Sequence, residues 1–521
     1  MKTIKNILIA LLATIALSLV SCEKMLDTEQ HGVETLETFY RTDIDTEEAL
    51  TTLYLYYSNS GTYYNIFFLK NLLSDDFWCG GGQRSDNAEN ERLNEYTFNA
   101  EHPYLRDAFQ NFYGVIYRAN QIIINVPGET PVQQRAIAEA KVFRALAYID
   151  LISMWGTPPL VDHPLTPSEY QQPNGDPAAL WALVESDLTE AIASNALREK
   201  ENANDNSSYR VTKQFAQALL GKAYVFQEKF AEAITPLDAV INSQKYELES
   251  ISEYENLLQY THENNSESVF EFNFLNDPQN AAVINMPFAM TGWRTDKMNI
   301  NPASDIYSAN STWGFCNPKK ELYDAFVSEE GENGSRLNQT FKNYDQFLAL
   351  GHSIRTGDML YGHEGIFTWK TRKVKGEINP GGFFDSHNNI RIMRYPEVLL
   401  LAAEAHLKGG GGKAIEYVNT VRTRAQLQTK GSVTMDDIML EKQLELCGEG
   451  VRFQDMLRWR IAEEKLSTQG TRVPTFHDNG TTTWETTNDP ATAGFKEQHW
   501  LLPFPQTELT NNPNIKQNPK W

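Results

Sequence analysis

The sequence predicts a mainly α-helical fold, in which a scaffold of tetratricopeptide-like helical pairs carries a large loop-rich, partly β overlay. Apolar residues recur at helical spacing through much of the first half of the chain and again after residue 395. Small residues lie on the faces where consecutive helices would touch, as in stacked helical repeats. Between residues 265 and 385 the periodicity fades, and Gly, Asn and aromatic residues become dense.

The N-terminus has the features of an export signal. Lys2 and Lys5 precede an apolar stretch that is too short to span a membrane, and this stretch ends at Ser21-Cys22. The pattern predicts a lipoprotein signal peptide over residues 1–21, with Cys22 lipidated as the first mature residue. The alternative is an ordinary secretory signal that happens to end near a cysteine. Each methylene of an attached lipid contributes about 0.8 kcal/mol on burial, so several chains would anchor the protein firmly.

Helical patterns follow in order along the chain. Residues 136–155 are apolar on several faces, which indicates a deeply buried helix. Residues 216–224 and 230–241 form a predicted helix pair, in which Pro236 should kink or restart the second helix, with Thr235 as a possible new cap. Residues 398–405 and 414–421 form a second pair, joined by a turn of four glycines.

The remaining segments are expected to be less regular. Residues 269–274 suggest a short strand, and residues 470–494 suggest a second loop-rich patch. Four prolines predict an extended tail over residues 500–521. We therefore divide the mature chain into an N-terminal part with helical repeat pairs, 22–264, and a C-terminal part, 265–521, which holds the loop-rich ligand region and the closing helices.

Charge and composition exclude several classes of function. The formal net charge of −22 makes nucleic acid a poor partner, although an acidic surface also simply keeps an exported protein soluble. No CxxC, HExxH or GxSxG pattern occurs, and no pair of catalytic carboxylates can be selected from 68 acidic residues. We expect no catalytic residues, no metal site and no cofactor. Cys79, Cys316 and Cys447 are expected to be buried free thiols.

Four segments resemble the SusD/RagB family, in the order in which that family has them. They are EAKVFRA at 139–145 with WGTPPLV at 155–161, RIMRYPEVLL at 391–400 with AEA at 403–405, LEKQLEL at 440–446 with GEGVR and DMLRW up to 459, and LPFPQTE at 502–508 with NPN and QNP up to 519. Lys442 and Gln443 depart from the family's usual paired arginines, and Cys447 stands where Phe or a small apolar residue is common. With the lipobox, the resemblance covers nearly the whole chain.

The resemblance implies a lipid-anchored protein on the outside of the outer membrane. Such proteins act as a lid over a TonB-dependent SusC-like barrel and bind glycans, or in the RagB branch peptides, without performing chemistry. The matching motifs are structural. Arg394 and Glu404 are expected to be buried partners, and Glu449 and Arg452 to form an internal ion pair.

Candidate ligand residues come from loop aromatics, because sugar rings stack on aromatic faces and their hydroxyls need polar side chains alongside. Two of Trp78, Trp293 and Trp313 are predicted to form the stacking platform. Ordinary core packing is the alternative for each, and Trp155, Trp181 and Trp459 are assigned to the core. The polar and aromatic neighbours included in the site are Asp76, Arg294, Asn299 and Tyr307.

The predicted function is noncatalytic capture of oligosaccharide or polysaccharide at the cell surface, for delivery to a SusC-like transporter. Peptide or glycopeptide capture by the same fold is the main alternative, and a surface adhesin or purely structural lipoprotein is a third possibility. A peptide binder should offer a sheet edge or a groove, which the sequence does not reveal.

Overall fold

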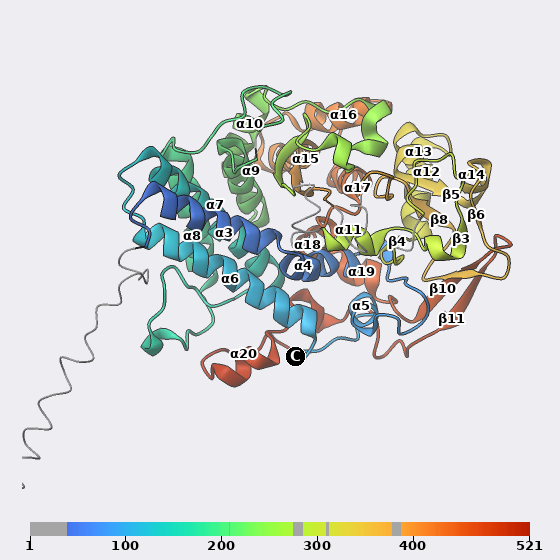
Figure 1. The fold of residues 1–521 in the computed structure, drawn as a ribbon, viewed down its shortest axis with the longest axis horizontal. Helices are drawn as coiled ribbons and strands as arrows, with labels where there is room; N and C mark the ends of the chain where they lie inside the picture. Colours follow the sequence, from blue (N-terminus) through green and yellow to red (C-terminus); the bar gives the residue numbers. More distant parts are fainter. Residues whose placement is uncertain (1–38, 208, 275–284, 309–311, 378–386) are drawn as a thin grey trace, which may run out of the picture.

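A computed structural model describes residues 39–521 except residues 208, 275–284, 309–311 and 378–386. Cys22 and the predicted signal peptide lie outside the described residues. Helices dominate, and the labelled small strands gather mainly on the right of Figure 1. Within the described ranges, no helix is both long and apolar enough to cross a bilayer. The predicted mainly α-helical fold is confirmed.

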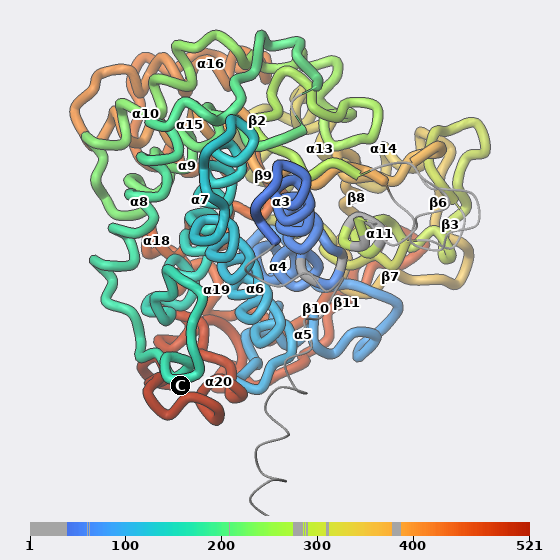
Figure 2. Tube along the Cα trace, turned by 60° about the vertical axis from the view of Figure 1, so that its left-hand side comes forward, coloured from blue at the N-terminus to red at the C-terminus, as the bar shows by residue number. Residues whose placement is uncertain are grey.

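The first layer consists of four long helices that lie side by side (Figure 2). They are α3 (Asp43–Ser58), α4 (Ser60–Leu72), α6 (Pro103–Asn125) and α7 (Pro131–Trp155). Thr130 begins α7 with a capping box to Gln133, and Pro131 occupies the first turn, where its missing N–H costs nothing. α7 is buried on most of its surface, which confirms the prediction for residues 136–155.

The repeat pairs continue this layer. They comprise α8 (Pro177–Ala193), α9 (Lys213–Phe226), α10 (Phe230–Asn242), α15 (Tyr395–Gly409), α16 (Ala414–Arg424) and α17 (Met435–Leu446). Gly410, with φ of +79°, ends α15 and confirms the glycine turn before α16. The restart predicted at Thr235 is wrong, because α10 continues through Pro236 from a cap at Lys229, while a kink at Pro236 stays a prediction.

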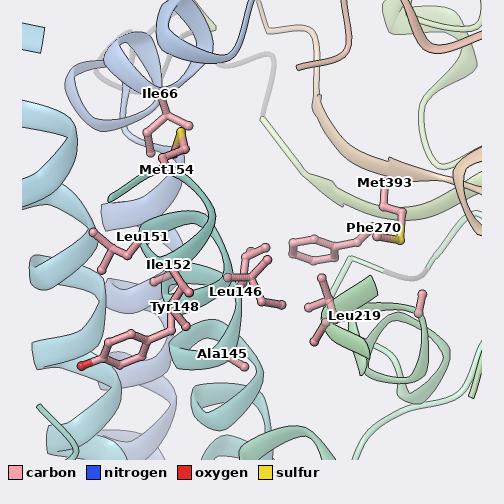
Figure 3. Packing of buried hydrophobic residues seen from close by; sticks show 14 of the residues in the cluster. Ile66, Ala145, Leu146, Tyr148, Leu151, Ile152, Met154, Leu219, Phe270 and Met393 are labelled. Atoms are coloured by element: carbon pink, nitrogen blue, oxygen red, sulfur yellow. The ribbon is translucent and has the colours of Figure 1, made fainter. Parts of the chain in front are cut away.

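The core lies between these helices and one short sheet. Strand β2 (Ser268–Phe272) pairs antiparallel with β9 (Ile390–Arg394), which confirms the strand predicted near residue 269. In Figure 3, Phe270 and Met393 of this sheet lie near Leu146 of α7 and Leu219 of α9. Burying each such side chain contributes about 1.5–3 kcal/mol, so the sheet is held firmly on the helical scaffold.

The overlay contains more regular structure than the sequence predicted. Its helices are α5 (Ala88–Asn94), α11 (Met286–Thr291), α12 (Lys320–Glu330), α13 (Ser335–Thr340), α14 (Tyr344–Ala349), α18 (Arg452–Arg458) and α19 (Ala462–Leu466). Its short strands are β1 (Phe77–Trp78), β3 (Met298–Asn299), β4 (Asn317–Pro318), β5 (Phe341–Asn343), β6 (Ser353–Ile354), β7 (Met359–Tyr361) and β8 (Ile366–Thr368). Single 3₁₀ turns lie at Pro167–Glu169, Ile251–Asn256, Tyr260–His262, Thr295–Lys297 and Glu497–Trp500.

Two predictions near the C-terminus are wrong. Residues 470–494 are not simply a loop, because β10 (Arg472–His477) and β11 (Thr482–Thr486) form a hairpin whose inner strand pairs with β7. The tail is not wholly extended either, because α20 (Gln506–Asn511) interrupts it. Cys79, Cys316 and Cys447 are buried and free, as expected.

Buried charges join the overlay to the scaffold. Arg394 is almost fully buried and forms ion pairs with Glu267, Glu445 and Glu449. The predicted pair between Glu449 and Arg452 is wrong, because Arg452 instead donates to the carboxylate of Asp75.

Asp75, the partner of Arg452, lies two residues before strand β1 in the chain. The Arg452 Nη2 atom is 2.7 Å from Asp75 Oδ2. The expectation that Glu404 is a buried structural partner is confirmed, since it is 1% exposed and pairs with Arg458 at 2.6 Å. The family-like motifs therefore serve the packing of the chain.

Candidate functional site

A cleft, which we call the α4 cleft, lies between helix α4, the segment around α11 and strand β9. It encloses about 510 Å³ of empty space, part of it open to solvent. Its lining consists of Tyr63, Phe67, Leu258, Asn285, Pro287, Thr291, Thr371, Asn389, Ile390, Arg391, Gly448 and Glu449.

Helix α4 supplies the aromatic side of the cleft. Tyr63 and Phe67 are four residues apart, so both project from one face of the helix. Their ring centroids are 6.3 Å apart, with an angle of 51° between the ring planes. Both side chains are only half-buried, so their rings offer apolar surface to a ligand.

The opposite wall is polar and rigid. Arg391 of β9 donates to Asn388 Oδ1 at 2.6 Å, to the Asn389 carbonyl at 2.8 Å and to the Gln259 carbonyl at 2.9 Å. The amide of Asn389 donates in turn to Glu271 at 3.0 Å. Because these groups are already hydrogen-bonded to one another, the wall is preorganised before a ligand binds. Preorganisation reduces the entropic cost of binding.

An ion cluster forms the base of the cleft. Glu449 lies between Arg394, at 2.6 Å, and Lys370. Burial works to raise the pKa of Glu449, but the positive charges of Arg394 and Lys370 outweigh it and hold that pKa below its ordinary value. Glu449 is therefore an ionised structural group at neutral pH and a poor proton donor.

A second cavity lies behind the first and shares Tyr63, Phe67, Arg391 and Glu449 with it. Its charged lining groups are paired, since Lys70 Nζ is 2.7 Å from Asp150 Oδ1. Burial and the Asp150 charge raise the pKa of the Tyr63 hydroxyl, so it remains a neutral hydrogen-bond donor. In the described part of the chain, no group of three or more His, Cys, Asp or Glu side chains could hold a metal ion.

Comparison with known proteins finds similarity to SusD-like proteins. Residues 356–521 match the SusD family model. The chain is 24% identical to SusD-like protein P25 of Formosa agariphila, over 96% of this chain and 95% of that protein. It is 23% identical to a SusD-like protein of Bacteroides ovatus, over 98% of this chain and 97% of that protein. Residues 356–521 thus match the SusD family, and the chain is similar to SusD-like proteins along nearly its whole length.

Solved structures of similar proteins share the fold. A laminarin-binding SusD-like protein superposes with a TM-score of 0.76 at 28% identity, over 92% of this chain and all of that one. Surface glycan-binding protein A from Bacteroides thetaiotaomicron, solved in complex with laminarihexaose, gives a TM-score of 0.73 at 23% identity, over 91% of this chain and 99% of that one.

The structure contradicts the exposure predicted for two of the three candidate tryptophans. Trp293 is 6% exposed, donates from Nε1 to the Thr368 carbonyl at 2.9 Å, and packs in an aromatic cluster with Phe347 and Phe367. Its ring faces are covered by other side chains. In this conformation the Trp293 ring offers little free surface to a ligand, and its contact with a ligand stays a prediction.

Trp78 and Asp76 are also buried. Trp78 is 8% exposed, and its Nε1 donates to Glu364 at 2.7 Å. Asp76 is 1% exposed and accepts from Gln443 at 2.8 Å. The glycines after Trp78 do not uncover its ring as predicted, because Gly81 N donates to the Gly314 carbonyl and closes the two loops together.

The other predicted residues are more accessible, and their contact with a ligand stays a prediction. Arg294 is occupied by a two-point ion pair with Asp296, at 2.6 and 2.8 Å. Asn299 is exposed and donates to Ser353, and Tyr307 is half-buried. Trp313 is half-buried against the main core.

Sequence reasoning missed the aromatic pair of α4 and the exposed Trp484. Tyr63 and Phe67 belong to the stretch TYYNIFFLK, which is typical of a core helix. The signal that could have revealed the pair is that aromatic residues occupy more faces of this helix than packing against the core on one face requires. Trp484 is 41% exposed in a strand of otherwise polar residues. A single tryptophan among polar residues was the sequence signal that could have predicted its exposure.

Proposed function

We propose that this protein captures glycan at the cell surface, without cleaving it, and delivers it to a TonB-dependent SusC-like barrel. The observation that carries the proposal is the likeness, along nearly the full length of both chains, to a solved laminarin-binding SusD-like protein. Laminarin, a neutral glucan, is therefore the first ligand to test.

The geometry of the α4 cleft supports this function. Tyr63 and Phe67 offer ring faces for the apolar side of a sugar, and the neutral Tyr63 hydroxyl can donate to a sugar oxygen. The fixed polar wall around Arg391 and Asn389 supplies hydrogen-bonding groups beside them. The carboxylate at its base is neutralised by cations, which suits binding better than acid–base chemistry.

The location forms part of the same proposal. Lipidation at Cys22 would tether the chain to the outer membrane, facing outwards, after removal of residues 1–21. We also retain the division into parts 22–264 and 265–521 as a proposal. Labelling with a palmitate analogue, compared between wild type and Cys22→Ala, tests the anchor directly.

Calorimetric titration with laminarihexaose tests the binding site. Tyr63→Ala should weaken binding about two- to twelvefold, which is the loss expected for one aromatic contact of about 0.5–1.5 kcal/mol. Tyr64→Phe is the matched control, because Tyr64 projects from another side of α4, where its hydroxyl bonds to Tyr104. Equal affinity in wild type and Tyr63→Ala would remove the α4 cleft from consideration.

Peptide capture, the RagB-like alternative, is favoured by one specific feature. Strand β11 is the edge of its three-stranded sheet, and its residues are almost all exposed. An extended peptide could pair with such an edge. A peptide pool that binds with higher affinity than any glycan on an array would favour this function.

A further inference from the structure

The β10–β11 hairpin presents an exposed tryptophan on the face of its sheet. Trp484 pairs with Pro474 across the two strands, and Thr486 pairs with Arg472. Because alternate residues of a strand share one face, Arg472 and Trp484 are diagonal neighbours on the same face. The guanidinium carbon of Arg472 is 5.0 Å from the centroid of the Trp484 ring.

The buried Trp78 packs against the exposed Trp484. The ring of Trp78 meets that of Trp484 edge to face, with centroids 5.8 Å apart and planes at 72°. Trp78 is fixed by its hydrogen bond to Glu364, which also accepts from the backbone N–H of Lys320 at 2.8 Å. Trp484 is thus the exposed member of a pair whose buried member is held in place.

We propose that this surface is a second saccharide contact, outside the α4 cleft, for the same glycan chain. We call it the Trp484 platform and define it by Trp484, Trp78, Arg472 and Glu364. The inference rests on the proposed glycan-binding function. Figure 1 shows β11 at the right edge of the molecule and α4 near its centre, so the two contacts lie on different parts of the protein.

The chemistry of the platform suits a neutral saccharide. An indole that is 41% exposed offers apolar surface to the C–H face of a sugar ring. Beside it, Arg472 is exposed, and among the described residues no carboxylate pairs with its guanidinium. Its N–H groups can therefore donate to sugar hydroxyls while the ring stacks.

A second contact matters most for long chains. A short oligosaccharide fills one contact, whereas a polysaccharide that spans both turns its second binding event into an intramolecular one. The Trp484 platform should thus raise the affinity for polymer and leave the affinity for short oligomers unchanged.

The test compares two ligands on three variants by calorimetry. Trp484→Ala should lower the affinity for laminarin about three- to tenfold and leave the affinity for laminarihexaose unchanged. Arg472→Ala should weaken laminarin binding in the same selective way. Tyr170→Ala removes a side chain that is 62% exposed in another part of the protein and should change neither affinity.

The outcomes separate the two proposals. If Trp484→Ala binds laminarin as tightly as wild type while Tyr63→Ala loses laminarihexaose, the inference is overturned and the proposed function stands. If wild type binds neither of these ligands nor any glycan on an array, both proposals are overturned. If a peptide pool competes at the hairpin and Trp484→Ala does not affect that competition, β11 acts as a peptide-binding edge instead. Circular dichroism on each variant shows whether a lost affinity reflects unfolding.

Discussion

Replacing Arg394 with alanine should destabilise the protein strongly. Arg394 is 2% exposed, and its guanidinium contacts three carboxylates, those of Glu267, Glu445 and Glu449. Arg424, Lys370 and Arg336 also pair with these carboxylates, but Arg336 is shared with two further buried carboxylates, those of Glu330 and Glu441. The substitution leaves an excess buried negative charge.

Removing one member of a buried pair typically costs 3–5 kcal/mol, because the remaining charge is left uncompensated in a poorly solvated site. We expect Arg394→Ala to lower the free energy of unfolding by about that amount. The matched control is Arg106→Ala, which breaks an exposed pair with Asp107 worth about 0–1 kcal/mol.

Urea unfolding, followed by circular dichroism and intrinsic fluorescence, gives the free energy of unfolding of both variants once unfolding has been shown to be reversible. The midpoint for Arg394→Ala should fall well below that for Arg106→Ala. If the two variants unfold within about 1 kcal/mol of each other, the cluster does not stabilise the fold in the way argued from its burial.

Two further predictions concern the core and the pH dependence of stability. Phe270→Ala should cost about 3–5 kcal/mol in urea unfolding, since Phe270 stacks on Phe215 at 4.6 Å, while Phe270→Leu should cost much less. For Asp76, burial and the neighbouring Asp75 charge raise the pKa to about 7. Between about pH 4 and pH 7 the folded protein keeps a proton that the unfolded chain releases, so stability falls as pH rises through this window. Asp76→Asn should reduce that slope, and an unchanged slope between pH 5 and pH 8 would rule out the contribution of Asp76.

The scaffold was predictable because its signals are local. Residues 136–155 and the glycine turn after α15 could be recognised from helical periodicity and from the conformation that only glycine adopts easily. The β10–β11 hairpin was missed because its outer strand is exposed on both faces, so no alternation of apolar and polar residues marked it.

The candidate site was harder to predict because burial depends on distant partners. Trp78 is covered through a hydrogen bond to Glu364, which lies 286 residues away in the chain. Trp293 is similarly closed by Thr368, which lies 75 residues away. A loop that looks open in the sequence becomes core when another segment packs on it, and nothing near Trp78 or Trp293 in the sequence indicates that segment.

The same long-range contacts explain how a loop-rich surface can hold a defined binding site. Glu449 lines the α4 cleft and is also tied to Arg394, which stands at the junction of β9 and α15. The position of the cleft floor is therefore set by the helical scaffold, and the loops around it need not fix it themselves. Since preorganised groups lose little entropy when a ligand binds, several modest contacts can add up to useful affinity without any one dominating. The proposed delivery of glycan would benefit from this distribution, because no single interaction has to be broken at a large cost.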